Sequence, residues 1–170
     1  MANIVVLGAG VAGHTAAAYL QKGLNKNEHK IKVISPTPNY QWIPSNIWVG
    51  VGRMTPEEIK FDLRPLYKKW GIEFIQAKAQ SFYPEGDEHM NTGFVEVEYT
   101  NEENKGEKIK VAYDYLINAT GPKLNFEATE GLVPGNGNIA SVCTFGHASH
   151  AWELFQEKLD KMKNGEKQIF

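Results

Sequence analysis

The sequence predicts an α/β fold, in which a parallel sheet forms the middle of three layers and carries a small antiparallel β insert. Three observations predict it. An apolar strand at 4–7 runs directly into a glycine turn, Gly8–Gly13, and a helical segment follows. A second apolar strand comes after that helix. Further along, residues 94–99 and 108–111 alternate between apolar and polar side chains, which is typical of half-exposed antiparallel strands.

The turn after the first strand has the spacing G-x-G-x-x-G. Gly8 permits the tight turn, Gly10 lets a phosphate approach the backbone, and Gly13 lets the next helix pack close to the strand. The helix, predicted at 11–24, would direct its positive N-terminal end at a bound pyrophosphate. We therefore predict a dinucleotide site in which backbone amides hold the pyrophosphate, at Gly8, Ala9, Gly10, Val11, Ala12 and Gly13.

The second strand is predicted at 31–34 and should lie parallel to the first, because a helix connects them. It ends at Ser35 and Pro36. Nicotinamide-binding domains usually have Asp or Glu at this position, and the carboxylate binds both ribose hydroxyls. Serine cannot accept two such bonds. The absence of a carboxylate at Ser35 and Pro36 therefore argues against a nicotinamide dinucleotide. We predict that these two residues lie beside the adenosine ribose.

The middle of the chain is predicted to contain a loop and short helical segments. Aromatic and proline residues dominate the loop at 37–52. Thr55 is a predicted N-cap, because Pro occupies the first helical position after it and two acidic residues follow in the first turn. A short helix is predicted at 65–70 and a strand at 72–75. These elements bring the chain back to the sheet.

The antiparallel insert begins near Ala79 and precedes a strand predicted to be buried, at 113–119, which ends in an Ala-Thr-Gly corner. A βαβ unit, then a three-stranded antiparallel insert, then such a strand is the element order of Rossmann-like FAD-binding domains in flavoproteins with two dinucleotide sites. We therefore predict FAD. The backbone at Ala79 would meet the adenine, and Thr120 and Gly121 would approach the isoalloxazine end.

Cys143 precedes a helix predicted at 145–162, with Thr144 as its N-cap. Free N–H groups and the positive end of the helix dipole favour a thiolate at that place. A thiolate is the species that carries sulfur-transfer chemistry. A lone cysteine is more often a small buried apolar residue. Composition alone leaves both interpretations of Cys143 open.

Composition and charge exclude several classes of protein. Lys and Arg number 18 and Asp and Glu 20, for a net charge of −2, so nothing indicates a nucleic-acid partner. No apolar run approaches the roughly 20 residues that span a bilayer, and the N-terminal residues show no signal peptide. One cysteine and five scattered histidines indicate no disulfide framework and no metal site. A strand starting at Lys167 predicts an incomplete FAD domain at 1–163 and the start of a second dinucleotide-type domain at 164–170.

Three segments resemble sulfide:quinone oxidoreductases, which belong to the FAD-dependent pyridine nucleotide-disulfide oxidoreductase superfamily. Residues 40–52, YQWIPSNIWVGVG, resemble the flavin-proximal loop of that family. Residues 113–124 resemble its second flavin-contact segment, and residues 141–148 resemble the segment that holds a redox cysteine. The resemblance runs through the chain in order, and it corresponds to the N-terminal portion of the family.

The resemblance implies a reaction. Sulfide attacks a sulfur bridge held by cysteines, a second cysteine thiolate adds to the flavin, and two electrons pass through FAD to a membrane quinone. It makes Cys143 the catalytic residue. Flavocytochrome c sulfide dehydrogenases, a neighbouring family, attach FAD through a cysteine in the loop at 40–52, where this chain has none. Non-covalent FAD is therefore expected, with flavin-side contacts at Ile43, Pro44, Ser45 and Asn46.

The resemblance also implies partners and a location. Sulfide and a quinone would be the substrates. The second cysteine and the helices that hold the enzyme on the membrane surface would belong to a C-terminal part, so the full-length protein is expected to be a peripheral protein of a prokaryotic inner membrane. This chain alone would be soluble and inactive, and a homo-oligomer is left open. Two alternatives remain: an NADH:quinone oxidoreductase, in which Cys143 has no role, and a nucleotide-binding module without turnover.

Overall fold

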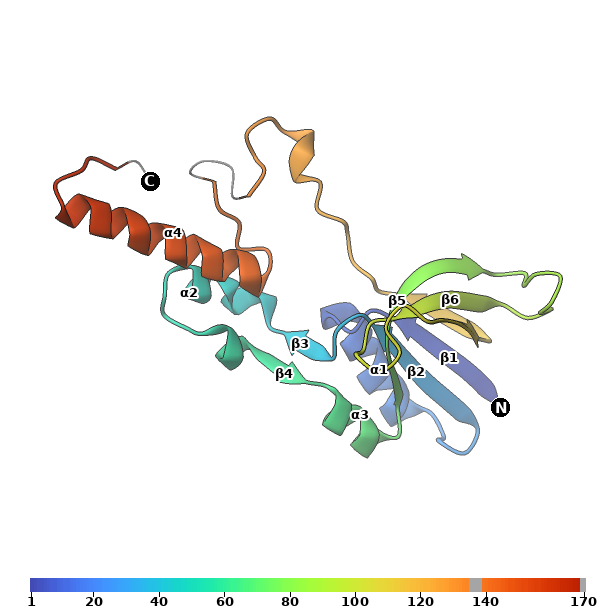
Figure 1. Cartoon of the computed structure of the whole chain (residues 1–170). Coiled ribbons are helices and arrows are strands. Elements are labelled where there is room, and N and C mark those ends of the chain that lie inside the picture. The colour runs from blue at the N-terminus through green and yellow to red at the C-terminus, as the bar shows by residue number, and fades with distance from the viewer. Residues whose placement is uncertain (135–138, 169–170) are drawn as a thin grey trace. The chain divides into compact units, whose positions relative to one another are not determined.

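The computed structural model describes residues 1–134 and 139–168, and the chain forms two compact units. The chain passes from one unit to the other through β3 (Asn39–Gln41) and returns through β4 (Lys60–Asp62), and these strands form a two-stranded sheet (Figure 1). Unit 1 consists of Met1–Tyr40 and Asp62–Gly121, and unit 2 of Gln41–Phe61 and Pro122–Phe170.

Unit 1 is built on a six-stranded sheet with the order β7-β6-β5-β2-β1-β8 (Figure 1). β1 pairs in parallel with β2 and β8, and β2 in parallel with β5, whereas β5, β6 and β7 are antiparallel. The predicted parallel sheet with an antiparallel insert is therefore confirmed. Its elements are β1 (Ala2–Leu7), α1 (Val11–Gly23), β2 (His29–Ser35), α3 (Arg64–Trp70), β5 (Glu73–Tyr83), β6 (Phe94–Tyr99), β7 (Lys108–Ala112) and β8 (Tyr115–Asn118).

β5 belongs to both the parallel and the antiparallel part of the sheet. Residues 73–76 pair with β2, and the strand then pairs with β6 from Ala77 onward. The strand predicted at 72–75 is thus much longer than expected. The reason is visible in the burial pattern, because Ile75 and Ala77 are buried while the residues between and after them are more exposed. This alternation continues the strand beyond the polar side chains that suggested its end.

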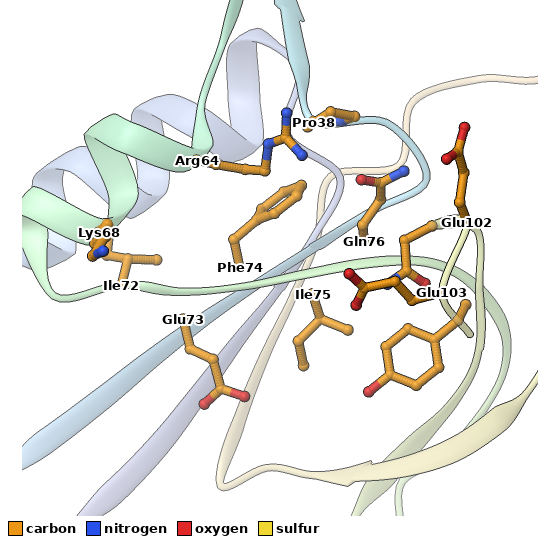
Figure 2. A pocket seen from close by; sticks show the side chains of 12 residues that line it. Pro38, Arg64, Lys68, Ile72, Glu73, Phe74, Ile75, Gln76, Glu102 and Glu103 are labelled. Atoms are coloured by element: carbon orange, nitrogen blue, oxygen red, sulfur yellow. The ribbon is translucent and has the colours of Figure 1, made fainter. Parts of the chain in front are cut away.

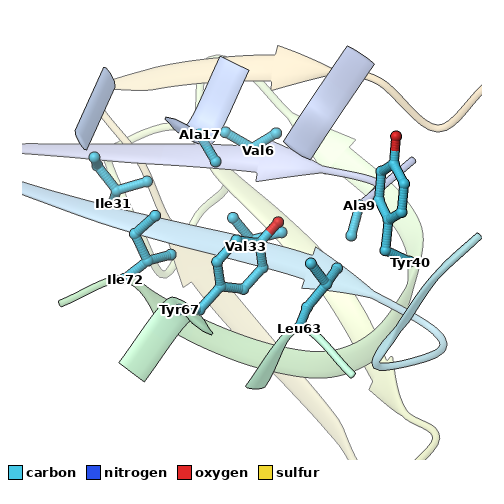
Figure 3. Packing of buried hydrophobic residues seen from close by; sticks show 9 residues of the cluster. All are labelled: Val6, Ala9, Ala17, Ile31, Val33, Tyr40, Leu63, Tyr67 and Ile72. Carbon is cyan, nitrogen blue, oxygen red and sulfur yellow. The ribbon is translucent and has the colours of Figure 1, made fainter. Parts of the chain in front are cut away.

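Apolar clusters cover the two faces of the sheet. On one face, Ala17 of α1 and Tyr67 of α3 join Val33 in a buried cluster (Figure 3). On the other face, Val97 of the insert joins Val5 in a second cluster. Successive residues of β1 alternate between these clusters, as expected for a strand with both faces covered. The helices thus cover one face of the parallel strands, and β6 and β7, which continue the same sheet through β5, pack against the other face, in agreement with the three predicted layers.

The strand predicted at 113–119 is shorter and more exposed than expected. β8 spans Tyr115–Asn118, none of its residues is buried, and Tyr115 is 65% exposed. Within the residues that the structure describes, β8 lies at an edge of the sheet and pairs with β1 alone. An edge strand lacks cover on one side, so an apolar run does not by itself predict burial.

Unit 2 is helical. Val49, Ile59 and Ala148 form its small buried core, which brings the middle segment of the chain against the start of α4. The predicted loop at 37–52 therefore contains short helices as well as β3. The Thr55 N–H donates to the Glu58 carboxylate (2.7 Å), as in a capping box, which confirms the predicted N-cap. The elements are η1 (Ile43–Ser45), α2 (Asn46–Gly50), η2 (Pro56–Ile59), η3 (Phe126–Ala128) and α4 (Phe145–Lys163).

The chain after α4 is described only as far as residue 168. Of the strand predicted at 167–170, Lys167 and Gln168 are described and form no strand, and residues 169–170 fall outside the described residues, as does part of the glycine-rich segment before Cys143. The domain boundary predicted between residues 163 and 164 stays a prediction. Among the helices that the structure describes, none combines the length and the apolar character needed to cross a lipid bilayer.

We predict that replacing glycine by alanine has different effects on the free energy of unfolding at two positions of α1. A Cβ at Gly13 would lie 1.9 Å from the carbonyl oxygen of Gly8, so Gly13→Ala forces the helix away from the strand and costs about 1–3 kcal/mol of unfolding free energy. A Cβ at Gly23 meets no atom within 4 Å, so Gly23→Ala is neutral or stabilises by up to about 1 kcal/mol. Urea unfolding measures both. Equal effects would contradict the close packing at Gly13.

Candidate functional site

The glycine turn is held between two neighbouring strands. The Gly8 N–H donates to the Ile34 carbonyl at the end of β2 (2.8 Å), and the Ala119 N–H, just after β8, donates to the Leu7 carbonyl (2.8 Å). Gly8 has a φ of +92°, and a Cβ there would lie 2.3 Å from the carbonyl oxygen of Ala119. Both the backbone conformation and the close neighbour therefore require glycine at this position.

The three glycines of the motif are required for different reasons. Gly8 and Gly13 are required by the protein itself, since a Cβ at either would overlap a backbone carbonyl oxygen. Gly10 has a φ of −73°, and a Cβ there would have no neighbour within 4 Å among the described atoms. Glycine is a common N-cap residue, but neither a positive φ nor a close neighbour requires it at position 10. A ligand that approaches the backbone at this point does explain it, as the sequence predicts.

The N-terminal end of α1 presents a surface that suits an anion. Gly10 is the N-cap, and Val11 and Ala12 are exposed beside it. No acidic residue lies in the first turn of this 13-residue helix, so its free N–H groups and positive end meet no competing carboxylate there. Ala9 is buried in the apolar cluster and supports the turn from within, so only its backbone is available to a ligand.

His14 follows the glycine turn and is not among the predicted site residues. Its Nδ1 lies 3.1 Å from the Tyr67 hydroxyl, and its ring stacks on Trp70 with centroids 5.7 Å apart. Burial lowers the pKa of His14 and raises the pKa of Tyr67 to about 12, so both side chains are neutral at neutral pH. His14 therefore contributes packing rather than positive charge beside the turn. In the sequence, this packing could have been inferred from the position of His14, a polar residue on the apolar face of the predicted helix.

The residues predicted beside the adenosine lie at the end of β2 and within β5. Ser35 is 6% exposed. Pro36 is exposed, and its carbonyl accepts a hydrogen bond from the Thr100 hydroxyl (2.7 Å). Ala79 lies inside β5, and its side chain packs against the apolar cluster that contains Val5 and Val97. Contact of these residues with ribose and adenine stays a prediction.

The predicted flavin-side corner lies directly against the glycine turn. A Cβ at Gly8 would come within 3.1 Å of the Cα of Thr120. The Thr120 N–H and hydroxyl both donate to the side-chain oxygen of Asn118 (3.2 and 2.8 Å), and Gly121 turns the chain with a φ of +75°. The fold thus brings together two sequence-predicted segments that are more than 100 residues apart.

A cavity of about 880 Å³ lies elsewhere in unit 1, along an edge of β5 (Figure 2). Five consecutive residues, 72–76, line it. Successive residues of a strand point to opposite faces, so a cavity that touches all five lies at the strand edge, before β6 begins to pair. Arg64 borders the cavity and is ion-paired with Asp62 (2.6 Å). None of the predicted cofactor residues lines this cavity, and we do not assign it to the dinucleotide.

Unit 2 contains the other predicted site residues. Residues 43–45 form η1, where Ile43 and Pro44 are exposed. Asn46 is only 1% exposed. Its side-chain oxygen accepts a hydrogen bond from the Gln41 amide (2.6 Å), and its side-chain nitrogen donates to the Val142 carbonyl (2.9 Å). The Asn46 amide is therefore engaged within unit 2, and contact of residues 43–46 with the flavin stays a prediction.

Cys143 is exposed, so it is not a buried apolar residue. It lies immediately before Thr144, whose hydroxyl accepts a hydrogen bond from the His147 N–H (3.2 Å) and thereby caps α4 as predicted. The Cys143 N–H donates to the Ser141 hydroxyl oxygen (3.1 Å). Within residues 1–134 and 139–168, no three His, Cys, Asp or Glu side chains gather as a metal site.

Comparisons with known proteins show a family and a fold. The family model of pyridine nucleotide-disulphide oxidoreductases matches residues 2–163. The sulfide-quinone reductase of Aquifex aeolicus (strain VF5) is 37% identical over 155 residues, which are 91% of this chain and 31% of that protein. The X-ray structure of the sulfide:quinone oxidoreductase from Aquifex aeolicus has a TM-score of 0.75 at 32% identity, covering 94% of this chain and 33% of that one.

A more distant structure shares the fold. NDH2 from Plasmodium falciparum, in complex with NADH, has a TM-score of 0.68 at 22% identity, over 95% of this chain and 30% of that one. The chain thus spans about a third of the length of the proteins it matches. The family match covers nearly the whole chain, including the glycine turn and the segment with Cys143. The chain belongs to the pyridine nucleotide-disulphide oxidoreductase family.

Proposed function

We propose that the full-length protein is a flavoenzyme that oxidises sulfide through Cys143 and passes two electrons through FAD to a quinone. The observation that carries this proposal is the 37% identity to a sulfide-quinone reductase over 91% of the chain. The exposed thiol of Cys143, directly before the N-cap of α4, supports it from the structure. Because the chain spans 31% of that relative, the activity is proposed for a longer protein.

The residues of the glycine turn fit the pyrophosphate of FAD. The space beside Gly10 is open, and no acidic side chain lies in the first turn of α1. Bound FAD would supply two-electron redox chemistry between sulfur and quinone. We propose that it is bound non-covalently, because residues 40–52 contain no cysteine. Acid precipitation should then leave the flavin in the supernatant, and a yellow pellet would contradict this.

Sulfide would enter the proposed reaction by thiol–disulfide exchange at Cys143. Attack of HS⁻ on a disulfide between Cys143 and a second cysteine would break that S–S bond, form a persulfide on one cysteine and release the other as a thiolate. Joining the persulfide to the thiolate in a bridge of three sulfur atoms would form a new S–S bond and release one proton to solvent and two electrons to FAD. The exposed position of Cys143 gives sulfide access to it. The second cysteine would come from a part of the protein outside this sequence.

Quinone as electron acceptor implies a location. Quinones dissolve in the bilayer, so an enzyme that reduces them works at the membrane surface. We therefore propose a peripheral protein of a prokaryotic inner membrane. NADH is the competing electron donor, since NDH2 shares the fold at 22% identity. That alternative leaves the exposed Cys143 without a role, which is why we favour sulfide.

Replacing Gly10 tests the cofactor site without disturbing the fold. A Cβ at Gly10 has no neighbour within 4 Å, so Gly10→Ala should lower the free energy of unfolding without FAD by no more than about 1 kcal/mol, which is the cost of alanine at an N-cap. It should weaken FAD binding by about 10-fold or more, equivalent to about 1.4 kcal/mol, because the methyl group occupies space needed by the pyrophosphate. Titration of flavin fluorescence measures the affinity. Gly23→Ala is the matched control, and equal FAD affinity in both variants would contradict the site.

Replacing Cys143 tests the chemistry. In the full-length protein, Cys143→Ser should retain FAD but lose sulfide-dependent quinone reduction, because a hydroxyl cannot carry the sulfur. The visible flavin spectrum reports the cofactor, and quinone absorbance reports turnover. Turnover at the wild-type rate in this variant would refute the role of Cys143. Ser149→Ala, on the same helix, serves as the matched control.

A further inference from the structure

We propose that Asn46 and Ser141 are positioning residues, which together fix the peptide group between Val142 and Cys143. This inference rests on the proposed function, because it concerns how the backbone of Cys143 is held for sulfur chemistry. The two side chains come from segments almost 100 residues apart in sequence. Neither is proposed to touch the sulfur.

Both polar ends of that peptide group are hydrogen-bonded. The Asn46 side-chain nitrogen donates to the Val142 carbonyl (2.9 Å), which is the oxygen of the peptide group. The Cys143 N–H is the only donor of this peptide group, and it donates to the Ser141 hydroxyl oxygen (3.1 Å). A peptide group is planar, so holding its oxygen and its N–H defines the orientation of the whole plane. The backbone that enters Cys143 is therefore fixed.

Asn46 is itself held in the orientation that this requires. The Gln41 amide nitrogen donates to the Asn46 oxygen (2.6 Å), which leaves the Asn46 nitrogen facing the Val142 carbonyl. Asn46 is 1% exposed, so an unbonded amide there would be costly. Both hydrogen bonds, from Gln41 to Asn46 and from Asn46 to Val142, thus agree with one orientation of the Asn46 amide.

The backbone that leaves Cys143 is fixed as well. Thr144 begins α4 as its N-cap, and its carbonyl accepts the Ala148 N–H (2.9 Å). On the other side, Gly50 leaves room for Val142, because a Cβ at residue 50 would lie 3.0 Å from a Val142 methyl carbon. An exposed thiol on a backbone held before and after it suits a transfer step, where a displacement of about 1 Å can reduce the rate about 100-fold.

The first experiment measures the backbone directly and does not depend on the reaction. Hydrogen exchange of the Cys143 amide is followed in the full-length protein by fragmentation mass spectrometry. Asn46→Ala and Ser141→Ala should each accelerate this exchange by about 10-fold, because each removes one hydrogen bond from the peptide group. Ser141→Thr, which keeps the hydroxyl, should restore slow exchange. Asn27→Ala, at an exposed asparagine, is the control and should change nothing. Unchanged exchange in both alanine variants would overturn the proposal.

The second experiment measures the consequence for turnover. In Ser141→Ala, the kcat of sulfide-dependent quinone reduction should fall by about 10- to 100-fold while the KM for quinone and the FAD content stay at wild-type values. Wild-type kcat would overturn a positioning role. Loss of FAD in proportion to activity would also overturn it, since Ser141 would then act on the cofactor. If Cys143→Ser keeps full turnover, the proposed function fails, and the exchange experiment still decides whether the peptide group is held.

Discussion

The close approach of three backbone segments at Gly8 is the constraint on which the rest of unit 1 depends. The Ala119 carbonyl oxygen occupies the place that a Cβ at Gly8 would need, and the Gly8 carbonyl oxygen does the same at Gly13. β1 therefore ends tightly between β2 and β8, and α1 starts directly against it. Backbone atoms therefore surround Gly8 and Gly13, whereas a Cβ at Gly10 would meet no described atom within 4 Å. The free N–H groups of the helix end lie beside Gly10.

The predicted pyrophosphate site and the proposed redox cysteine belong to different compact units of the chain. Unit 1 contains the glycine turn and the Thr120–Gly121 corner, and both consist of backbone held by its neighbours. Unit 2 contains one exposed thiol, Cys143, on a backbone held by Asn46. The family is shown by the match over residues 2–163, whereas sulfide as the substrate is proposed from one relative and one residue.

Local patterns predicted the features that depend on neighbours in sequence. The glycine turn, the alternating strands and the Thr144 cap were all recognisable, because each is determined within about ten residues. The exposure of β8 was not, since it depends on which strands lie beside it. The hydrogen bond of Asn46 to Val142 could not be predicted either, because the two residues lie 96 positions apart. Every residue has a backbone carbonyl, so a sequence does not indicate which one accepts.

We propose that reduced sulfur, rather than a nicotinamide, donates electrons to a flavin bound at the glycine turn. The most direct measurement adds sulfide without oxygen to the full-length protein loaded with FAD, and follows the visible absorbance band of the oxidised flavin. Sulfide should bleach this band, a quinone should restore it, and NADH should leave it unchanged. Bleaching by NADH with no response to sulfide would rule out sulfide as the electron donor.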